Sequence, residues 1–161
     1  MPQRRRASAV CLALLLGALT AVQSTATTWR TYPVDDSLSH TEPPSAALRW
    51  RAPLPTPGTA PMLDAFLNVR IVLNLAPWVG KSARIYMIMP PVPQSSLSVE
   101  WVGSGTLQGG RLSGGQRQLV FQGVVAGQRL EDTLKLRASV DARDTAPLPP
   151  VNFRFEIEVP A

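Results

Sequence analysis

The most regular hydrophobic pattern in the chain lies close to its end. From residue 151 to residue 159, apolar side chains occupy every second position, and polar or charged side chains fill the positions between. The apolar positions are Val151, Phe153, Phe155, Ile157 and Val159. Successive side chains of a strand point to opposite faces, so this segment predicts a strand with one apolar and one charged face. Such a strand needs a second layer that covers its apolar face.

Earlier segments repeat this pattern. Alternation or short apolar runs predict strands at 66–75, 84–89, 97–101, 117–125 and 133–140. The glycine-rich stretch 103–115 predicts tight turns between very short strands, where positive φ angles are needed. The pattern therefore predicts an all-β fold, an antiparallel two-sheet β-sandwich of immunoglobulin-like type with about seven strands. A small barrel stays open as an alternative, and the strand order does not follow from the pattern.

The first 26 residues are predicted to be an export signal peptide. Residues 4–6 are arginines, residues 7–22 are an almost unbroken apolar run, and residues 24–26 (Ser-Thr-Ala) offer a cleavage site after Ala26. The alternative is an uncleaved anchor helix, but the apolar run is shorter than the roughly 20 residues that a membrane span needs. We therefore expect an exported protein, in the periplasm, on the cell surface or secreted, with no membrane attachment after cleavage.

The remaining chain divides into a proline-rich N-terminal lead-in, residues 27–62, and a β-sandwich domain, residues 63–161. Prolines break helices and cannot donate to a strand ladder, so the lead-in is expected to be mostly irregular. Two short pieces of it, Thr28–Val34 and Leu48–Arg51, are candidate edge strands.

Charge and cysteine content exclude several classes of function. Three of the 16 basic residues lie in the signal, which leaves 13 basic against 11 acidic residues, scattered without a basic patch. Nucleic acid is therefore not an expected partner. The one cysteine, Cys11, also lies in the signal, so thiol chemistry, a cysteine metal site and a disulfide are not expected after cleavage. We expect no cofactor.

Catalytic patterns are weak throughout. Residues 80–82 (Gly-Lys-Ser) resemble the end of a phosphate-binding loop, but position 75 is Leu and a strand follows, which favours a turn. The only histidine, His40, lies in the lead-in and is expected to be a solvated loop residue. The acidic pairs at 35–36, 131–132 and 141/144 are all expected in turns, bound to their own backbone. The sequence therefore predicts a protein that is not an enzyme.

Aromatic residues offer an alternative function. Trp101 alternates with Val99 and is expected in the core, whereas Trp50 and Trp78 lie where an exposed carbohydrate platform is conceivable. One possible function is therefore that of a freestanding periplasmic or secreted binding module, with glycan as its ligand.

The layout resembles a bacterial fimbrial (pilin-like) subunit of the chaperone–usher type. The resemblance covers about residues 66–159. It rests on the export signal, the single β-rich domain behind a long N-terminal lead-in, and the alternating strand that closes the chain. Residues 78–87, the glycine-rich hairpin and residues 130–134 (Leu-Glu-Asp-Thr-Leu) also resemble such subunits.

This resemblance implies an incomplete sandwich that assembles by β-strand complementation. The residues that would line the edge strand of the open groove are Val151, Phe153, Phe155, Ile157 and Val159. Thr27–Val34, which we call the arm, would be the strand donated to a neighbour. The partners would be a periplasmic chaperone or other subunits, bound through sheet edges by main-chain hydrogen bonds and alternate side chains. The implied function is that of a fimbrial, pilus or cell-adhesion subunit.

Overall fold

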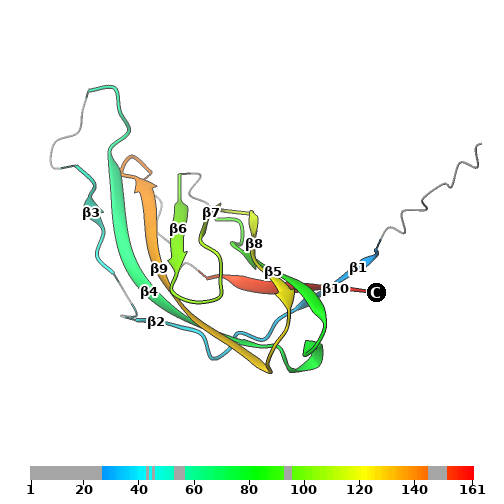
Figure 1. The fold of residues 1–161 in the computed structure, drawn as a ribbon. Helices are drawn as coiled ribbons and strands as arrows, with labels where there is room; N and C mark the ends of the chain where they lie inside the picture. The colour runs from blue at the N-terminus through cyan, green and yellow to red at the C-terminus, as the bar shows by residue number, and fades with distance from the viewer. Residues whose placement is uncertain (1–26, 43, 45, 53–56, 93–95, 145–151) are drawn as a thin grey trace, which may run out of the picture.

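Two antiparallel β-sheets packed against each other form the molecule (Figure 1). The computed structural model describes residues 27–42, 44, 46–52, 57–92, 96–144 and 152–161. The predicted all-β sandwich is confirmed within these residues, with one 3-10 turn at Ala76–Trp78. The strands are β1 (Trp29–Pro33), β2 (His40–Glu42), β3 (Arg49–Trp50), β4 (Met62–Asn74), β5 (Ser82–Ile88), β6 (Ser98–Gly103), β7 (Gly110–Ser113), β8 (Arg117–Val124), β9 (Arg129–Asp141) and β10 (Arg154–Pro160).

The strand order shares its centre with an immunoglobulin domain and differs at the edges. The first sheet has the order β1-β10-β5-β8, and the second has β2-β4-β9-β6-β7, with β3 also paired to β4. If β4 to β10 are matched to the seven immunoglobulin strands in chain order, β5 pairs with β8 and β6 with β9, as in that fold. The first and last of these seven strands lie in the opposite sheets from their immunoglobulin counterparts. Here β4 lies beside β9, and β10 lies beside β5.

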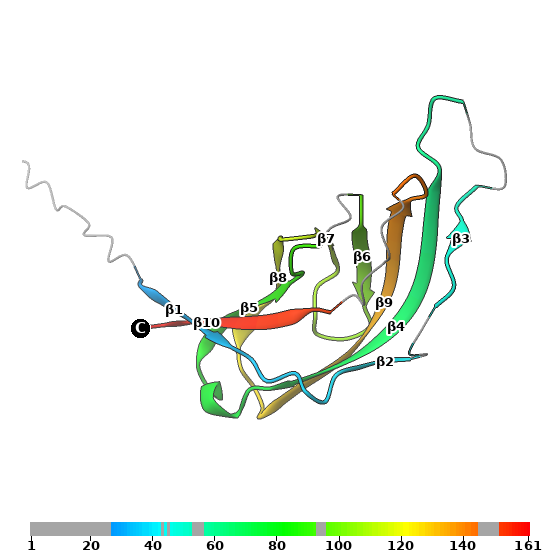
Figure 2. The same ribbon diagram turned by 180° about the vertical axis from the view of Figure 1, so that it is seen from behind.

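The longest ladder joins β4 to β9 over the full length of both strands, from Met62 opposite Asp141 to Asn74 opposite Arg129. The alternating leucine, valine and isoleucine positions of β4 point into the sandwich, as the pattern predicted. Ile71 and Leu73 are fully buried there, opposite Asp132 and Leu130 of β9. Both strands curve together along one side of the molecule (Figure 2).

More strands are present than the seven expected, because several are only two to four residues long and give no periodic pattern. The glycine-rich stretch contains one of these, β7, and only Gly115 within it has a positive φ, of 78°. Elsewhere in the stretch the glycines are required mainly by close approach. A Cβ on Gly103 would lie 2.2 Å from the carbonyl oxygen of Leu107, so a side chain cannot fit there.

The lead-in contributes to both sheets. Its first strand, β1, joins the first sheet, and the chain then crosses to the second sheet, where β2 and β3 pair with β4. Between them Val34 is buried in the core, and Ser39 bonds the main chain of Val72 with its hydroxyl (Val72 N to Ser39 Oγ, 2.9 Å). The lead-in therefore closes one side of the sandwich and is less irregular than its prolines suggested.

Candidate functional site

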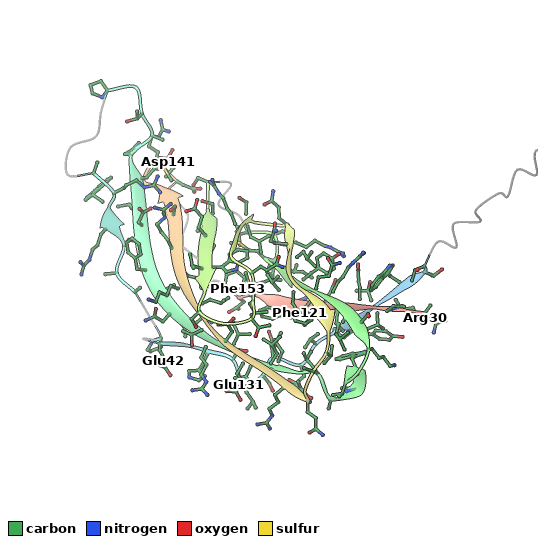
Figure 3. All side chains as sticks on the ribbon, in the orientation of Figure 1. Arg30, Glu42, Phe121, Glu131, Asp141 and Phe153 are labelled. Carbon is green, nitrogen blue, oxygen red and sulfur yellow. The ribbon has the colours of Figure 1, made fainter. Side chains whose placement is uncertain are left out.

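The last strand, β10, lies inside the first sheet with a neighbour on each side. Phe155, Ile157 and Val159 point into the core and are almost completely buried, which confirms the predicted alternation. Phe153, just before the strand, is partly buried against the same core, as Figure 3 shows. Val151, the first residue of the predicted strand, lies outside the described residues.

The place beside β10 that the resemblance left open is filled by the chain's own arm. β1 pairs antiparallel with β10, from Trp29 opposite Pro160 to Pro33 opposite Glu156. On its other side β10 pairs with β5, from Arg154 opposite Ile88 to Glu158 opposite Arg84. The last strand is therefore an internal strand in this structure, and β1 is the edge.

Two main-chain hydrogen bonds fix which way each residue of β10 faces. The amide of Val34 donates to the carbonyl of Phe155 (2.9 Å), and the amide of Ala161 donates to the carbonyl of Thr28 (2.8 Å). In an antiparallel ladder, the N–H and C=O of one residue point to the same neighbour, and successive residues alternate. Within 155–161, the odd-numbered residues therefore point their main-chain N–H and C=O groups toward β1, and the even-numbered residues point theirs toward β5.

The prolines of this pairing lie where they remove no ladder bond. By the same alternation the nitrogen of Pro33 faces away from β10, and that of Pro160 lies beyond the last β5–β10 pair. Proline is tolerated on an edge strand in this orientation. Because Pro33 has no N–H, only the amides of Trp29 and Thr31 are exposed on the outer edge of β1. This edge is therefore a poor template for pairing with a further strand.

The side chains of β1 contribute little burial. Four of its five residues are exposed and Trp29 is half-buried, so within the arm only Val34 is buried in the core. Two ring contacts supplement the ladder. The guanidinium of Arg84 lies 4.2 Å from the centre of the Trp29 ring, and the Tyr32 ring lies 6.1 Å from that of Trp78. Figure 3 shows Arg30 well outside the body of the sandwich.

The arm covers all of β10 except its first residue, Arg154. After Val34 the chain leaves for the second sheet, where Asp35 bridges to Asn74. A hollow of about 210 Å³ lies near the beginning of β10, between Phe153 and Phe155 on one side and Leu67 and Val69 of β4 on the other, with residues 39–41 at its rim. The walls of this hollow are about equally polar and apolar.

The outer face of β10 is tied by charge to β8. Arg117 donates to Glu158 (Nη2 to Oε1, 2.6 Å), lies 3.9 Å from Glu156 and covers the ring of Tyr86 at 3.9 Å. The hydrogen bond to Glu158 raises the pKa of Arg117. The pattern of alternating charges predicted a solvated face, and the structure adds a cross-strand clamp over β5.

The two tryptophans considered as carbohydrate platforms differ in their surroundings. Trp78 is partly buried, packs against the core and contacts Tyr32, so its ring is not an open platform. Trp50 is 58% exposed and lines a hollow of about 230 Å³ together with residues 51–52 and 59–62. The structure therefore separates them, and only Trp50 keeps the geometry that a platform needs.

A buried polar cluster beside Trp50 had no signal in the sequence. Arg51 donates to both carboxylate oxygens of Asp64 (Nε to Oδ2 3.0 Å, Nη2 to Oδ1 2.8 Å), and Ser139 donates to Oδ1 at 2.8 Å. The bonds from Arg51, assisted by the one from Ser139, hold the pKa of Asp64 below its usual value although burial opposes this. The three residues are far apart in the chain and meet only through the β3–β4–β9 pairing.

The prediction that Glu131 and Asp132 lie in a turn is wrong. Both are in β9, and Asp132 points into the sandwich, where the amide of Leu107 (2.7 Å) and the hydroxyl of Ser104 (3.1 Å) donate to its carboxylate. Buried polar groups in folded proteins are hydrogen-bonded, and here the bonds join the loop to β9. Asp132 therefore anchors the glycine-rich loop and is not a turn residue.

The remaining candidates are placed as follows. Gly80 and Lys81 lie in a turn, with Gly80 at φ 81°, and Ser82 begins β5. His40 is in β2, where its ring is hydrogen-bonded to Glu42 (2.7 Å). This bond, and to a smaller extent the bond to the Leu38 carbonyl, raises the pKa of His40. Asp141 ends β9 and binds Arg143.

In the part of the chain that the structure describes, no three His, Cys, Asp or Glu side chains gather as metal ligands, and no helix is long and apolar enough to cross a membrane. Comparison with protein-family models, with curated proteins and with solved structures gave no match.

Proposed function

We propose that this chain is an exported, non-enzymatic β-sandwich protein that assembles with partner proteins by exchanging a β-strand beside β10. This is the function of a fimbrial, pilus or adhesion subunit. The arm would leave β10, and a strand from a partner would take its place, or the arm would insert beside the last strand of a neighbour. The partners are proteins that offer an extended strand.

The observation that carries the proposal is the contrast between the main chain and the side chains of β1. Its ladder to β10 runs over all five residues, yet four of these are exposed. A strand held mainly by main-chain hydrogen bonds can be replaced by any strand of suitable shape, because these bonds are the same for every amino-acid sequence. The buried face of β10 supplies the selectivity through Phe155, Ile157 and Val159.

Two further features support the proposal. The arm directly follows the predicted signal peptide, so cleavage after Ala26 would leave it at the free end of the exported protein. The hollow at Phe153, which Leu67 and Val69 of β4 also line, continues the line of β10 beyond the last residue that the arm covers. A donated strand longer than the arm would therefore bury more apolar surface than the arm does.

The test uses residues 27–161 purified from the periplasm, with molar mass and melting temperature measured with and without a peptide of residues 27–40. The proposal expects either a ladder of oligomers or a monomer in which the labelled peptide is incorporated. The control is the same peptide with Val34 replaced by Asp, which places a charge in the core and should not bind. A monomer that takes up neither peptide and forms no oligomer would contradict the proposal.

A further inference from the structure

Trp50 is a large apolar side chain held in an exposed position by a very short strand. It lies on β3, two residues long, opposite Leu63 of β4. Among the described residues, no aromatic ring or cation stacks on its indole, which is 58% exposed. Tryptophan is enriched at binding interfaces, because its ring offers a large apolar face and its N–H a hydrogen-bond donor.

The neighbouring residue fixes this strand in place. The main-chain amide of Arg51 donates to the carbonyl of Met62 (3.0 Å), and its side chain makes the two bonds to Asp64 and a third to Ser139 (2.9 Å). The Asp64 side chain is only 6% exposed, so the carboxylate is a buried and rigid anchor. Two parallel bonds of an arginine to a carboxylate set the direction of the guanidinium as well as its position. Trp50 is therefore attached to a preorganised base.

The hollow next to Trp50 is small, mostly apolar and without net charge. Its volume of about 230 Å³ lies below the roughly 300–1,000 Å³ of pockets that enclose drug-sized ligands. The residues that line it are Trp50, Arg51, Ala52, Thr59, Ala60, Pro61 and Met62. Arg51 is the one charged member of this lining, and Asp64 neutralises it. Its Nη1 makes no hydrogen bond to the residues that the structure describes, and the side chain is 44% exposed.

We propose that Trp50 and Arg51 form a binding site for a neutral sugar ring, as a terminal or internal unit of a polysaccharide. A pyranose ring has an apolar face of C–H bonds that packs on an indole, and hydroxyl groups at its edge that accept hydrogen bonds. The indole of Trp50 supplies the platform, and Nη1 of Arg51 supplies the donor. Because the arginine is already paired, the site does not favour an acidic sugar over a neutral one.

This site is independent of the strand exchange proposed above. β3 lies at the end of the molecule away from β1, in the view of Figure 1 and in the reversed view of Figure 2. It also belongs to the other sheet. Sugar binding can therefore fail while the arm exchanges, and the arm can be fixed while the sugar binds.

The test is titration calorimetry of residues 27–161 with cellohexaose, with maltohexaose and with an acidic oligogalacturonate. At least one neutral hexamer should bind, and Trp50→Ala should weaken this binding by about tenfold or more while leaving the melting temperature nearly unchanged. Phe66→Ala is the matched control, because Phe66 is also an exposed aromatic of the second sheet (65%) but does not line the hollow. Its binding should equal that of the unmodified chain.

Three results would overturn the proposal. These are the failure of both neutral hexamers to bind, binding that survives Trp50→Ala, or an equal loss in Phe66→Ala. Asp64→Asn tests the charge argument separately, because it leaves Arg51 uncompensated while keeping the shape of the anchor. This variant should gain affinity for the oligogalacturonate relative to the neutral hexamers, and an unchanged preference would show that the neutralised arginine does not set the selectivity.

Discussion

The two neighbours of β10 are paired to it by the same kind of ladder, yet they are held by different forces. On one side, β5 presents Ala83, Ile85 and Met87 to the core, all essentially without solvent exposure. On the other side, β1 has no fully buried side chain of its own, and the arm depends on Val34 just beyond the strand. Main-chain hydrogen bonds contribute modestly to net stability because water competes for them, whereas buried apolar side chains contribute about 1.5–3 kcal/mol each. This difference is what the proposed strand exchange requires, with β5 as a permanent part of the fold and β1 as the strand that detaches.

The largest expected difference comes from one substitution on each side. Ile85→Ala removes a fully buried side chain and should lower the free energy of unfolding by about 2–5 kcal/mol. Tyr32→Ala on β1 should lower it by less than about 1 kcal/mol, because the ring is 38% exposed. Urea unfolding of both variants measures this. Equal losses would mean that the arm is as integral to the fold as β5.

Val34→Asp should detach the arm and leave the rest of the sandwich folded. An unpaired carboxylate at this buried position opposes docking of the arm, but the contacts of β4, β5 and β9 do not depend on it. Trypsin then reaches the bond after Arg30 more easily, and cleavage there should be at least about tenfold faster. Cleavage throughout the body at the same rate would instead indicate global unfolding. Val102→Asp, an exposed position on the second sheet, serves as the control.

The contact between Trp29 and Arg84 should contribute less. A double-mutant cycle of Trp29→Ala and Arg84→Ala is expected to give a coupling free energy of about 0.5–1 kcal/mol, typical of a cation over an aromatic face near solvent. The readout is again urea unfolding, or the affinity of the arm peptide where the arm has been removed. A coupling free energy of zero would mean that this contact does not help to hold the arm.

The smallest expected effect is a pH dependence of the stability, which arises from His40 in β2, the strand that follows the arm. The pKa of His40 is raised by Glu42, so its contribution is complete below the unfolded value of about 6.5 and is lost as the pH rises through the folded value. His40→Gln should therefore remove a small loss of stability that begins as the pH rises above about 6.5. The measurement compares urea midpoints of both chains across this range. An identical pH profile in the variant would show that the His40–Glu42 pair contributes nothing.

The sequence predicted the parts of the fold that depend on local periodicity. Alternation identified Phe155, Ile157 and Val159 as one buried face, and it identified the inward face of β4. It did not predict the pairing of the arm with β10, because that ladder joins residues at the two ends of the described chain and the arm carries Arg30 among its inward positions. Strands as short as β3 and β7 contain too few residues for any period to appear.

The pattern of apolar and polar positions also did not predict hydrogen bonds between residues that are distant in the sequence. Asp132 sits among hydrophobic residues on the inward face of β9, and its partners Ser104 and Leu107 become neighbours only when the loop folds back. The sequence predicted the same role, an exposed carbohydrate platform, for both Trp50 and Trp78. Their burial differs because Trp78 lies next to the core and the arm, whereas Trp50 lies on an outlying strand.

The central claim, that β1 detaches while β5 stays, is tested most directly by amide hydrogen exchange along β10. The amides of Ile157, Val159 and Ala161 face β1, and those of Glu156 and Glu158 face β5. Because an arm that opens locally frees only the first set, those amides should exchange at least about tenfold faster than the second set, giving an alternating profile within one strand. Equal protection of both sets would mean that β1 opens only with the whole fold, and it would contradict the account.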